Sequence, residues 1–117
     1  MAKECYRNIP IYEVPLANNI RGAADPNEIW INSRYDFPSA ANRQATVQHE
    51  YIHVVQQMEH SDNPNEWTWK GFFKWAYAYI RDLVIKGSYW NNIFERDARD
   101  WQSDPINRPM NNWSNYN

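Results

Sequence analysis

Residues 49–53 read His-Glu-Tyr-Ile-His, a spacing that could hold a catalytic metal ion. Residues four positions apart stand on one face of a helix, so His49 and His53 can reach the same ion. Glu50 is turned by about 100° from His49 around the helix axis, and its carboxylate can therefore reach a water molecule in the open coordination position. Zinc would acidify that water and polarise a carbonyl, while Glu50 takes the proton and passes it to the leaving amine. The motif predicts zinc-dependent hydrolysis with Glu50 as general base and acid.

The third ligand must come from outside this motif. His60 lies seven residues beyond His53, about 10 Å along a continuous helix, so it cannot reach the same ion and is expected to be a surface histidine. A metzincin would have a glycine at position 56 and a ligand histidine at position 59, but the chain has Gln56 and Glu59 there. These two residues exclude the metzincin arrangement.

Glu95 is the better candidate for the third ligand. It belongs to a separate predicted helix, beside the apolar stripe of Phe94, Ala98 and Trp101, where a partly buried carboxylate needs a cation. The alternative partner is Arg99, four residues later, which could form an ordinary ion pair with Glu95 on the helix surface. The two histidines could likewise be solvated on a surface helix, and the residues alone leave both interpretations open.

The elements that would position these residues follow from the spacing of apolar side chains. Residues 9–14 and 29–31 are typical of short strands, and the two could pair as antiparallel neighbours. Apolar residues at helical spacing then predict an amphipathic helix over residues 40–59, with Ser39 as its N-cap. This helix would carry the His-Glu-x-x-His motif.

Two more helices are predicted after the turn-forming residues 62–65. The first, residues 66–86, is apolar nearly all round and should be central, with Gly87 as its stop. The second covers residues 91–102 and ends before Pro105. Strands followed by helices predict an α+β fold, with a small antiparallel N-terminal sheet over a helical body.

Composition limits the class of protein and its partners. A chain of 117 residues supports one core, so residues 1–117 should form a single domain, with 1–8 and 103–117 as flexible segments. The net charge of −2, without a dense basic run, argues against nucleic acid as a partner. No stretch is long and apolar enough to span a membrane, and no secretory signal is recognised, so no membrane partner and a cytoplasmic location are expected unless the chain is exported by another route.

Two other features each have a plain and a functional interpretation. Cys5 is expected to be an inert small side chain, although its thiolate could instead reach the zinc and keep a precursor latent. The aromatic run from Trp67 to Tyr79 has the spacing of a buried helix, which favours a core role over a substrate-binding one.

Residues 49–57, H-E-Y-I-H-V-V-Q-Q, followed by residues 92–98, N-I-F-E-R-D-A, resemble the small gluzincin peptidases known as minigluzincins. The resemblance covers about residues 9–102 and implies a zincin-like fold. It implies an edge strand, here residues 28–32 with Trp30, that lies above the cleft and pairs with an extended peptide or protein substrate. It also implies a zinc site in which His49, His53 and Glu95 are the ligands and Glu50 is the general base.

The chain departs from that family at two places. Many gluzincins have an aspartate four residues after the ligand glutamate, where it orients a histidine, but this chain has Arg99 there and only Asp97 or Asp100 nearby. No donor to the oxyanion is matched either, and Tyr89 is the candidate. These departures support a rival interpretation, a zinc-binding module without appreciable turnover. A latent precursor, with its cleft filled by the Asn-rich tail or the N-terminal segment, is a third.

Overall fold

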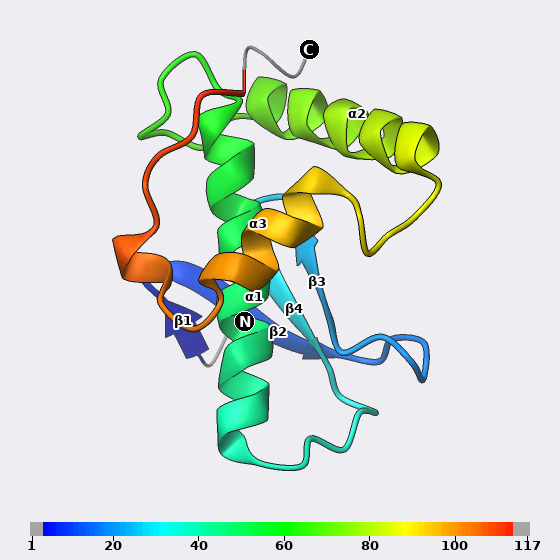
Figure 1. Ribbon diagram of the computed structural model, residues 1–117. Helices are drawn as coiled ribbons and strands as arrows, with labels where there is room; N and C mark the ends of the chain where they lie inside the picture. Colours follow the sequence, from blue (N-terminus) through cyan, green and yellow to red (C-terminus); the bar gives the residue numbers. More distant parts are fainter. Residues whose placement is uncertain (1–3, 114–117) are drawn as a thin grey trace.

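The N-terminal third of the chain forms a sheet, and the remainder forms a helical body (Figure 1). The structure is a computed structural model that describes residues 4–113. The strands are β1 (Glu4–Tyr6), β2 (Ile9–Val14), β3 (Gly22–Asp25) and β4 (Glu28–Asn32). The helices are α1 (Ala40–Glu59), α2 (Trp69–Lys86) and α3 (Ile93–Trp101), followed by the short 3-10 helix η1 (Pro105–Asn107). The predicted α+β class is confirmed.

The sheet is mixed, and the predicted antiparallel sheet is wrong. Its strand order is β1-β2-β4-β3, and β2 pairs with β4 in parallel, with Ile11 opposite Ile29. The reason is β3, which sequence analysis missed because Gly-Ala-Ala-Asp contains no β-branched or aromatic residue. The chain reverses direction into β3 and again at a turn where Asn27 adopts φ 55°. Two reversals leave β4 running in the same direction as β2.

The same strand order corrects the predicted edge strand. Residues 28–32 form β4, which lies between β2 and β3 and is therefore an inner strand. Its Ile29 and Ile31 are fully buried and pack with Val47 and Val54 of α1. The two strands at the edges of the sheet are β1 and β3.

The helix boundaries agree closely with the predicted ones. Helix α1 covers residues 40–59 as predicted, and the Ser39 hydroxyl accepts a hydrogen bond from the backbone N–H of Asn42 at 3.1 Å. Helix α2 ends at Gly87, whose φ of 62° suits glycine and whose N–H donates to the Leu83 carbonyl. Helix α3 begins after Asn92, whose side chain caps its first turn.

Helix α1 is the central element of the fold, with the sheet on one side and α2 and α3 on the other (Figure 1). Helix α2 is less central than predicted. Its Trp75 and Ala78 are buried in a helical core with Phe94 and Trp113, but its opposite face is exposed. None of the helices among residues 4–113 is both long and apolar enough to cross a membrane.

The two segments predicted to be flexible contact the domain within the described residues. Glu4 in β1 forms an ion pair with Arg43 at 2.8 Å. Near the other end, the guanidinium of Arg108 is buried between the carboxylates of Glu59, at 2.8 Å, and Asp97, at 2.6 Å. The Asn-rich residues 114–117 and residues 1–3 lie outside the described part of the chain.

The buried position of Arg108 generates the first prediction. Arg108→Ala should lower the free energy of unfolding by about 3–5 kcal/mol, because two buried carboxylates lose their cation. Chemical denaturation followed by circular dichroism measures this change. The matched variant Arg34→Ala removes an exposed arginine and should leave the denaturation midpoint unchanged. Equal midpoints for Arg108→Ala and the parent chain would contradict the structural role of this ion pair.

Candidate metal centre

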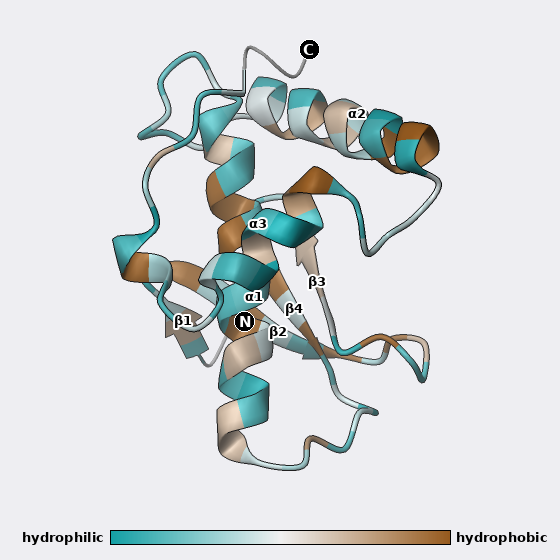
Figure 2. Cartoon of the chain, viewed as in Figure 1, coloured by the Kyte–Doolittle hydropathy of each residue, from teal (hydrophilic) through white to brown (hydrophobic). Residues whose placement is uncertain are grey.

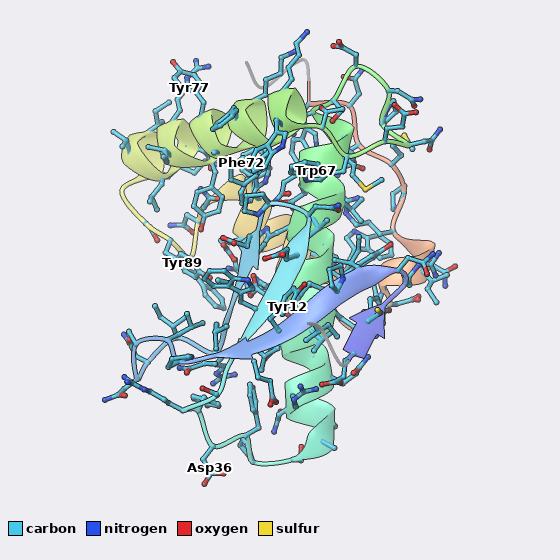
Figure 3. All side chains as sticks on the ribbon, turned by 180° about the vertical axis from the view of Figure 1, so that it is seen from behind. Tyr12, Asp36, Trp67, Phe72, Tyr77 and Tyr89 are labelled. Carbon is cyan, nitrogen blue, oxygen red and sulfur yellow. The ribbon has the colours of Figure 1, made fainter. Side chains whose placement is uncertain are left out.

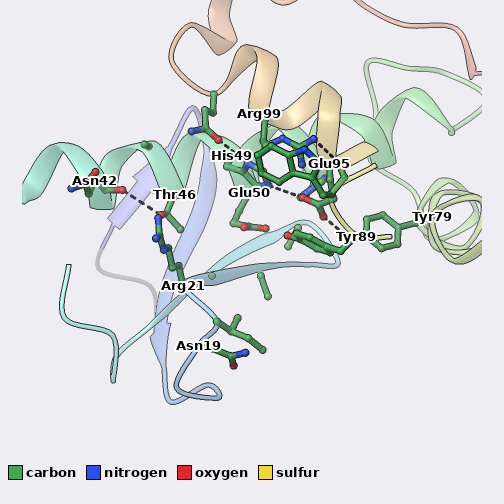
Figure 4. A pocket seen from close by; sticks show the side chains of 18 of the residues that line it. Asn19, Arg21, Asn42, Thr46, His49, Glu50, Tyr79, Tyr89, Glu95 and Arg99 are labelled. Carbon is green, nitrogen blue, oxygen red and sulfur yellow. Dashed lines mark hydrogen bonds and ion pairs between the residues drawn. The ribbon is translucent and has the colours of Figure 1, made fainter. Parts of the chain in front are cut away.

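Helices α1 and α3 bring three potential metal ligands together, and Figure 4 labels two of them, His49 and Glu95. His49 and His53 lie one turn apart on α1, and Glu95 faces them from α3. One ligand atom from each residue lies within 4.8 Å of the others. The Nε2 atoms of His49 and His53 lie 2.8 Å and 3.1 Å from the two carboxylate oxygens of Glu95. The predicted grouping of these three residues is therefore present.

The chemistry of these atoms fits a metal ion. His53 is buried, and its Nε2, although 3.1 Å from Glu95, has no hydrogen-bond partner. A buried ring nitrogen without such a bond fits a position that a metal ion or a water molecule would fill. Two imidazole nitrogens and one carboxylate oxygen suit a divalent transition metal, and three protein ligands leave one tetrahedral position open. The group could hold a metal ion with a free coordination site.

Each imidazole is held by a glutamine on its far side. His49 Nδ1 donates to Gln102 Oε1 at 2.9 Å, and His53 Nδ1 donates to Gln56 Oε1 at 2.8 Å. When each ring is neutral and keeps its proton on Nδ1, its Nε2 lone pair is directed at the candidate metal position. The family resemblance led us to expect an orienting oxygen at position 99. In the structure, the oxygen beside His49 comes from Gln102, three residues later.

The orientation of Gln56 is set by its own hydrogen bonds. Its Nε2 donates to the Phe94 carbonyl at 3.0 Å and to Asp97 Oδ2 at 2.8 Å, so its Oε1 must face His53. The indole of Trp75 donates to the same Oε1 at 3.0 Å. From the sequence, Gln56 had no predicted role at the site, although it lies within the motif of residues 49–57. Its place three residues after His53, on the same helix face, was the signal for this role.

The carboxylate of Glu95 is buried, and both of its oxygens contact polar side chains. Burial would raise its pKa, but the close contacts of this carboxylate with His49, His53 and the Tyr79 hydroxyl hold the pKa well below its usual range. Burial alone would lower the pKa of His53. The effect of the nearby Glu95 carboxylate is larger and raises this pKa to about 9. Because a ligating imidazole must be neutral, metal binding at this group releases a proton.

Tyr79 is a contact that sequence analysis missed. Its hydroxyl donates to Glu95 Oε2 at 2.6 Å, and burial together with the Glu95 charge raises its pKa, so the phenol stays a donor. The run from Trp67 to Tyr79 was assigned to the core, and Trp75 is indeed buried. However, both Trp75 and Tyr79 also line the cavity at the candidate metal centre.

Arg99 does not form the predicted alternative ion pair with Glu95. Its guanidinium lies over the Trp90 ring, 3.8 Å from the ring centre, and donates to the Trp90 carbonyl. Helix α3 turns Glu95 inward and leaves Arg99 at the rim of the cavity (Figure 4). The surface-pair interpretation of Glu95 is therefore wrong.

His60 is buried, and its predicted surface position is wrong. Its Nδ1 donates to the Gln56 carbonyl at 2.8 Å, and its ring stacks on Trp113 with an interplanar angle of 12°. Burial lowers its pKa. The chain after α3 returns across the end of α1 and covers His60, a contact that local spacing could not reveal. His60 is not part of the candidate ligand group.

A cavity of about 780 Å³ opens beside the three candidate ligands. Glu50 and Tyr89 both line it, and Figure 4 shows them facing the same space. Burial raises the pKa of Glu50 more strongly than His53 and His49 lower it. The Tyr89 ring is largely exposed, and burial of its hydroxyl and the Glu95 charge raise its pKa. Cys5 is exposed on β1 and does not line this cavity.

Strand β3 forms the wall of the cavity that faces α1. Gly22, Ala23 and Ala24 all line the cavity. A Cβ atom at Gly22 would lie 2.9 Å from the Trp30 carbonyl oxygen, closer than packing allows, and 3.3 Å from Glu50 Cγ, which is a tight contact. Glycine at position 22 therefore lets this edge strand approach Glu50.

No protein-family model matches the chain, and no curated protein or solved structure gives a significant match. The class of the protein is consequently defined by its own fold and site. It is an α+β domain in which two histidines and one glutamate, beside a cavity, could hold a metal ion.

The ligand group generates the second prediction. Glu95→Ala should reduce the affinity for Zn²⁺ at least about tenfold, because one of three protein ligands is lost, and His49→Ala should do the same. Isothermal titration of the folded variants measures this affinity. Glu66→Ala, which changes an exposed glutamate, should bind as the parent chain does. Undiminished affinity in Glu95→Ala would place the ion elsewhere.

The glutamine beside His53 generates the third prediction. Gln56→Met keeps the volume but removes the hydrogen bond that orients the imidazole, and the affinity for Zn²⁺ should fall by about 10–100-fold. Gln44→Met makes the same change at an exposed site of α1 and should bind Zn²⁺ as the parent chain does. Undiminished affinity in a folded Gln56→Met variant would contradict the orienting role of Gln56.

Proposed function

We propose that the protein is a zinc-dependent peptidase of the gluzincin type, with a zincin-like active-site helix α1. The observation that carries the proposal is the meeting of His49, His53, Glu95 and Glu50 at one cavity. Two histidines and a glutamate are the ligand set of several zinc peptidases. The resemblance of residues 49–57 and 92–98 to minigluzincins points to the same chemistry.

Glu50 is the general base in this proposal. It follows His49 on α1, is not one of the grouped ligands, and lines the cavity from a buried position. When bound, zinc would acidify a water molecule and polarise the substrate carbonyl. The Glu50 carboxylate accepts the proton of the attacking water and then delivers it to the leaving amine, which completes hydrolysis of the peptide bond.

Two other groups support the same reaction. Gln56 and Gln102 hold the two imidazoles in a fixed orientation. The Tyr89 hydroxyl faces the cavity and is the candidate donor to the oxyanion that forms on the substrate carbonyl. Tyr79 also has its hydroxyl at this site, where it donates to Glu95, and the Tyr89 hydroxyl interacts with Glu95 as well.

The substrate would be an extended peptide that pairs with β3. This strand is at the edge of the sheet and lines the cavity, whereas the strand with Trp30 is an inner one. Unpaired backbone groups at a sheet edge accept a peptide as an added strand, without requiring a particular sequence. The small side chains of Gly22, Ala23 and Ala24 leave room for it.

A zinc-binding module without turnover is the remaining alternative. It was suggested by the missing aspartate, but Gln102 occupies the equivalent place beside His49. The latent-precursor alternative needs a terminal segment in the cleft. Within the described part of the chain, neither residues 4–8 nor residues 103–113 line the cavity. Active peptide hydrolysis is therefore the function that the site supports best.

The role of Glu50 generates the fourth prediction. Glu50→Gln retains size and a hydrogen-bonding oxygen but cannot accept a proton, so cleavage of a broad peptide library should fall by about 10²–10⁴-fold. Zinc content and the melting temperature should stay near those of the parent chain. Glu66→Gln, an exposed counterpart, should change none of the three measurements. A zinc-loaded parent chain that cleaves nothing would favour the binding module, and equal cleavage by Glu50→Gln would show that Glu50 is not the general base.

A further inference from the structure

The outer face of α2 carries a continuous apolar stripe. Its members are 58% to 74% exposed, unusually high values for such large apolar side chains, and they are Trp69, Phe73, Tyr77, Ile80 and Val84. Their spacing of three or four residues aligns them along one side of the helix. Figure 3 shows Tyr77 directed away from the body of the domain, and Figure 2 shows α2 at the edge of the molecule.

The stripe cannot turn inward, because the opposite face of α2 is tightly fixed. A Cβ atom at Gly71 would lie 2.1 Å from Ser61 Oγ and 2.6 Å from the Gln57 carbonyl oxygen, so the helix sits directly against the end of α1. Trp75 is buried on the same inner face and hydrogen-bonded to Gln56. The exposure of the stripe is therefore a fixed property of the fold.

Basic side chains run beside the apolar stripe. At 100° per residue, Lys70, Lys74 and Arg81 fall next to it on the same exposed face. The one acidic residue of α2, Asp82, is buried and paired with Lys86 at 3.2 Å. Lys70 also contacts Asp62 at 3.1 Å, but such an exposed pair contributes little. The outer face of α2 is thus apolar and cationic.

We propose that this face of α2 docks on the surface of an anionic lipid bilayer. A helix that presents aromatic and aliphatic residues beside Lys and Arg lies in the plane of a membrane interface, with its apolar side chains in the acyl boundary. The basic side chains meet anionic headgroups, and their long stems allow this while the stripe is buried. A large exposed apolar patch on a folded domain marks such an interaction site.

A second copy of the chain fits this face less well. Pairing two α2 helices through the stripe would bring the Lys74 and Arg81 side chains of both copies together, and like charges oppose that contact. The expectation of no membrane partner rested on the lack of a spanning segment, which interfacial docking does not need. The proposal is also independent of metal binding and peptide hydrolysis.

Sedimentation with lipid vesicles tests the proposal. The protein should sediment with vesicles of phosphatidylcholine mixed with phosphatidylserine, and much less with phosphatidylcholine alone. Arg81→Glu should lower the partition coefficient at least about tenfold, because it removes charge attraction. The double variant with Ile80→Ser and Val84→Ser should also lower it at least about tenfold, because it removes apolar burial. Added salt should weaken binding.

Matched controls come from other parts of the surface. Arg34→Glu makes the same charge change at an exposed site after β4, and Ile106→Ser removes an apolar side chain that is 67% exposed on η1. Both should bind vesicles as the parent chain does. The proposal is overturned if the parent chain does not bind anionic vesicles, or if the controls lose as much binding as the α2 variants. A dimer that the Ile80→Ser and Val84→Ser pair dissolves would also overturn it.

Discussion

The burial of one carboxylate governs how the helices of this domain fit together. Glu95 is 3% exposed, and a carboxylate at that depth is tolerated only where several donors surround it. Its partners are His49 and His53 from α1 and Tyr79 from α2, while Glu95 itself is on α3. All three helices must therefore be correctly packed before this charge is satisfied. The condition for a stable helical body is also the condition that assembles the candidate metal centre.

A series of polar contacts extends this constraint to the C-terminal part of the described chain. Gln56 links His53 to Asp97, and Asp97 is held by Arg108, which in turn binds Glu59. The segment after α3 thus contributes charge to the support of a ligand more than fifty residues earlier in the sequence. Polar groups are linked in series, and each has its partners only while the next one stays in place. Together with Trp113, which is buried against Phe94, this series explains why the segment lies against the helices.

Sequence patterns predicted what is local and missed what depends on distant contacts. The helix with the two histidines was predictable because apolar spacing and the Ser39 cap act within one element. Glu95 could be chosen because a carboxylate beside an apolar stripe needs a cation. By contrast, the parallel pairing of β2 and β4 depends on β3, whose Gly-Ala-Ala-Asp sequence favours no strand. The burial of His60 and the contact of Tyr79 with Glu95 arise only after other elements pack over them.

The hydrogen bonds between the two histidines and two glutamines bear on how folding and metal binding are related. Gln102 and Gln56 belong to the packed domain, and they orient His49 and His53 through protein hydrogen bonds alone. In small zinc fingers the ion itself supplies the free energy of folding, so chelators unfold them. Here the two rings are oriented by protein hydrogen bonds, so the proposed ion would enter a site that the fold has already arranged. Under the proposed function, the supply of metal in the surroundings would then control activity without controlling the amount of folded protein.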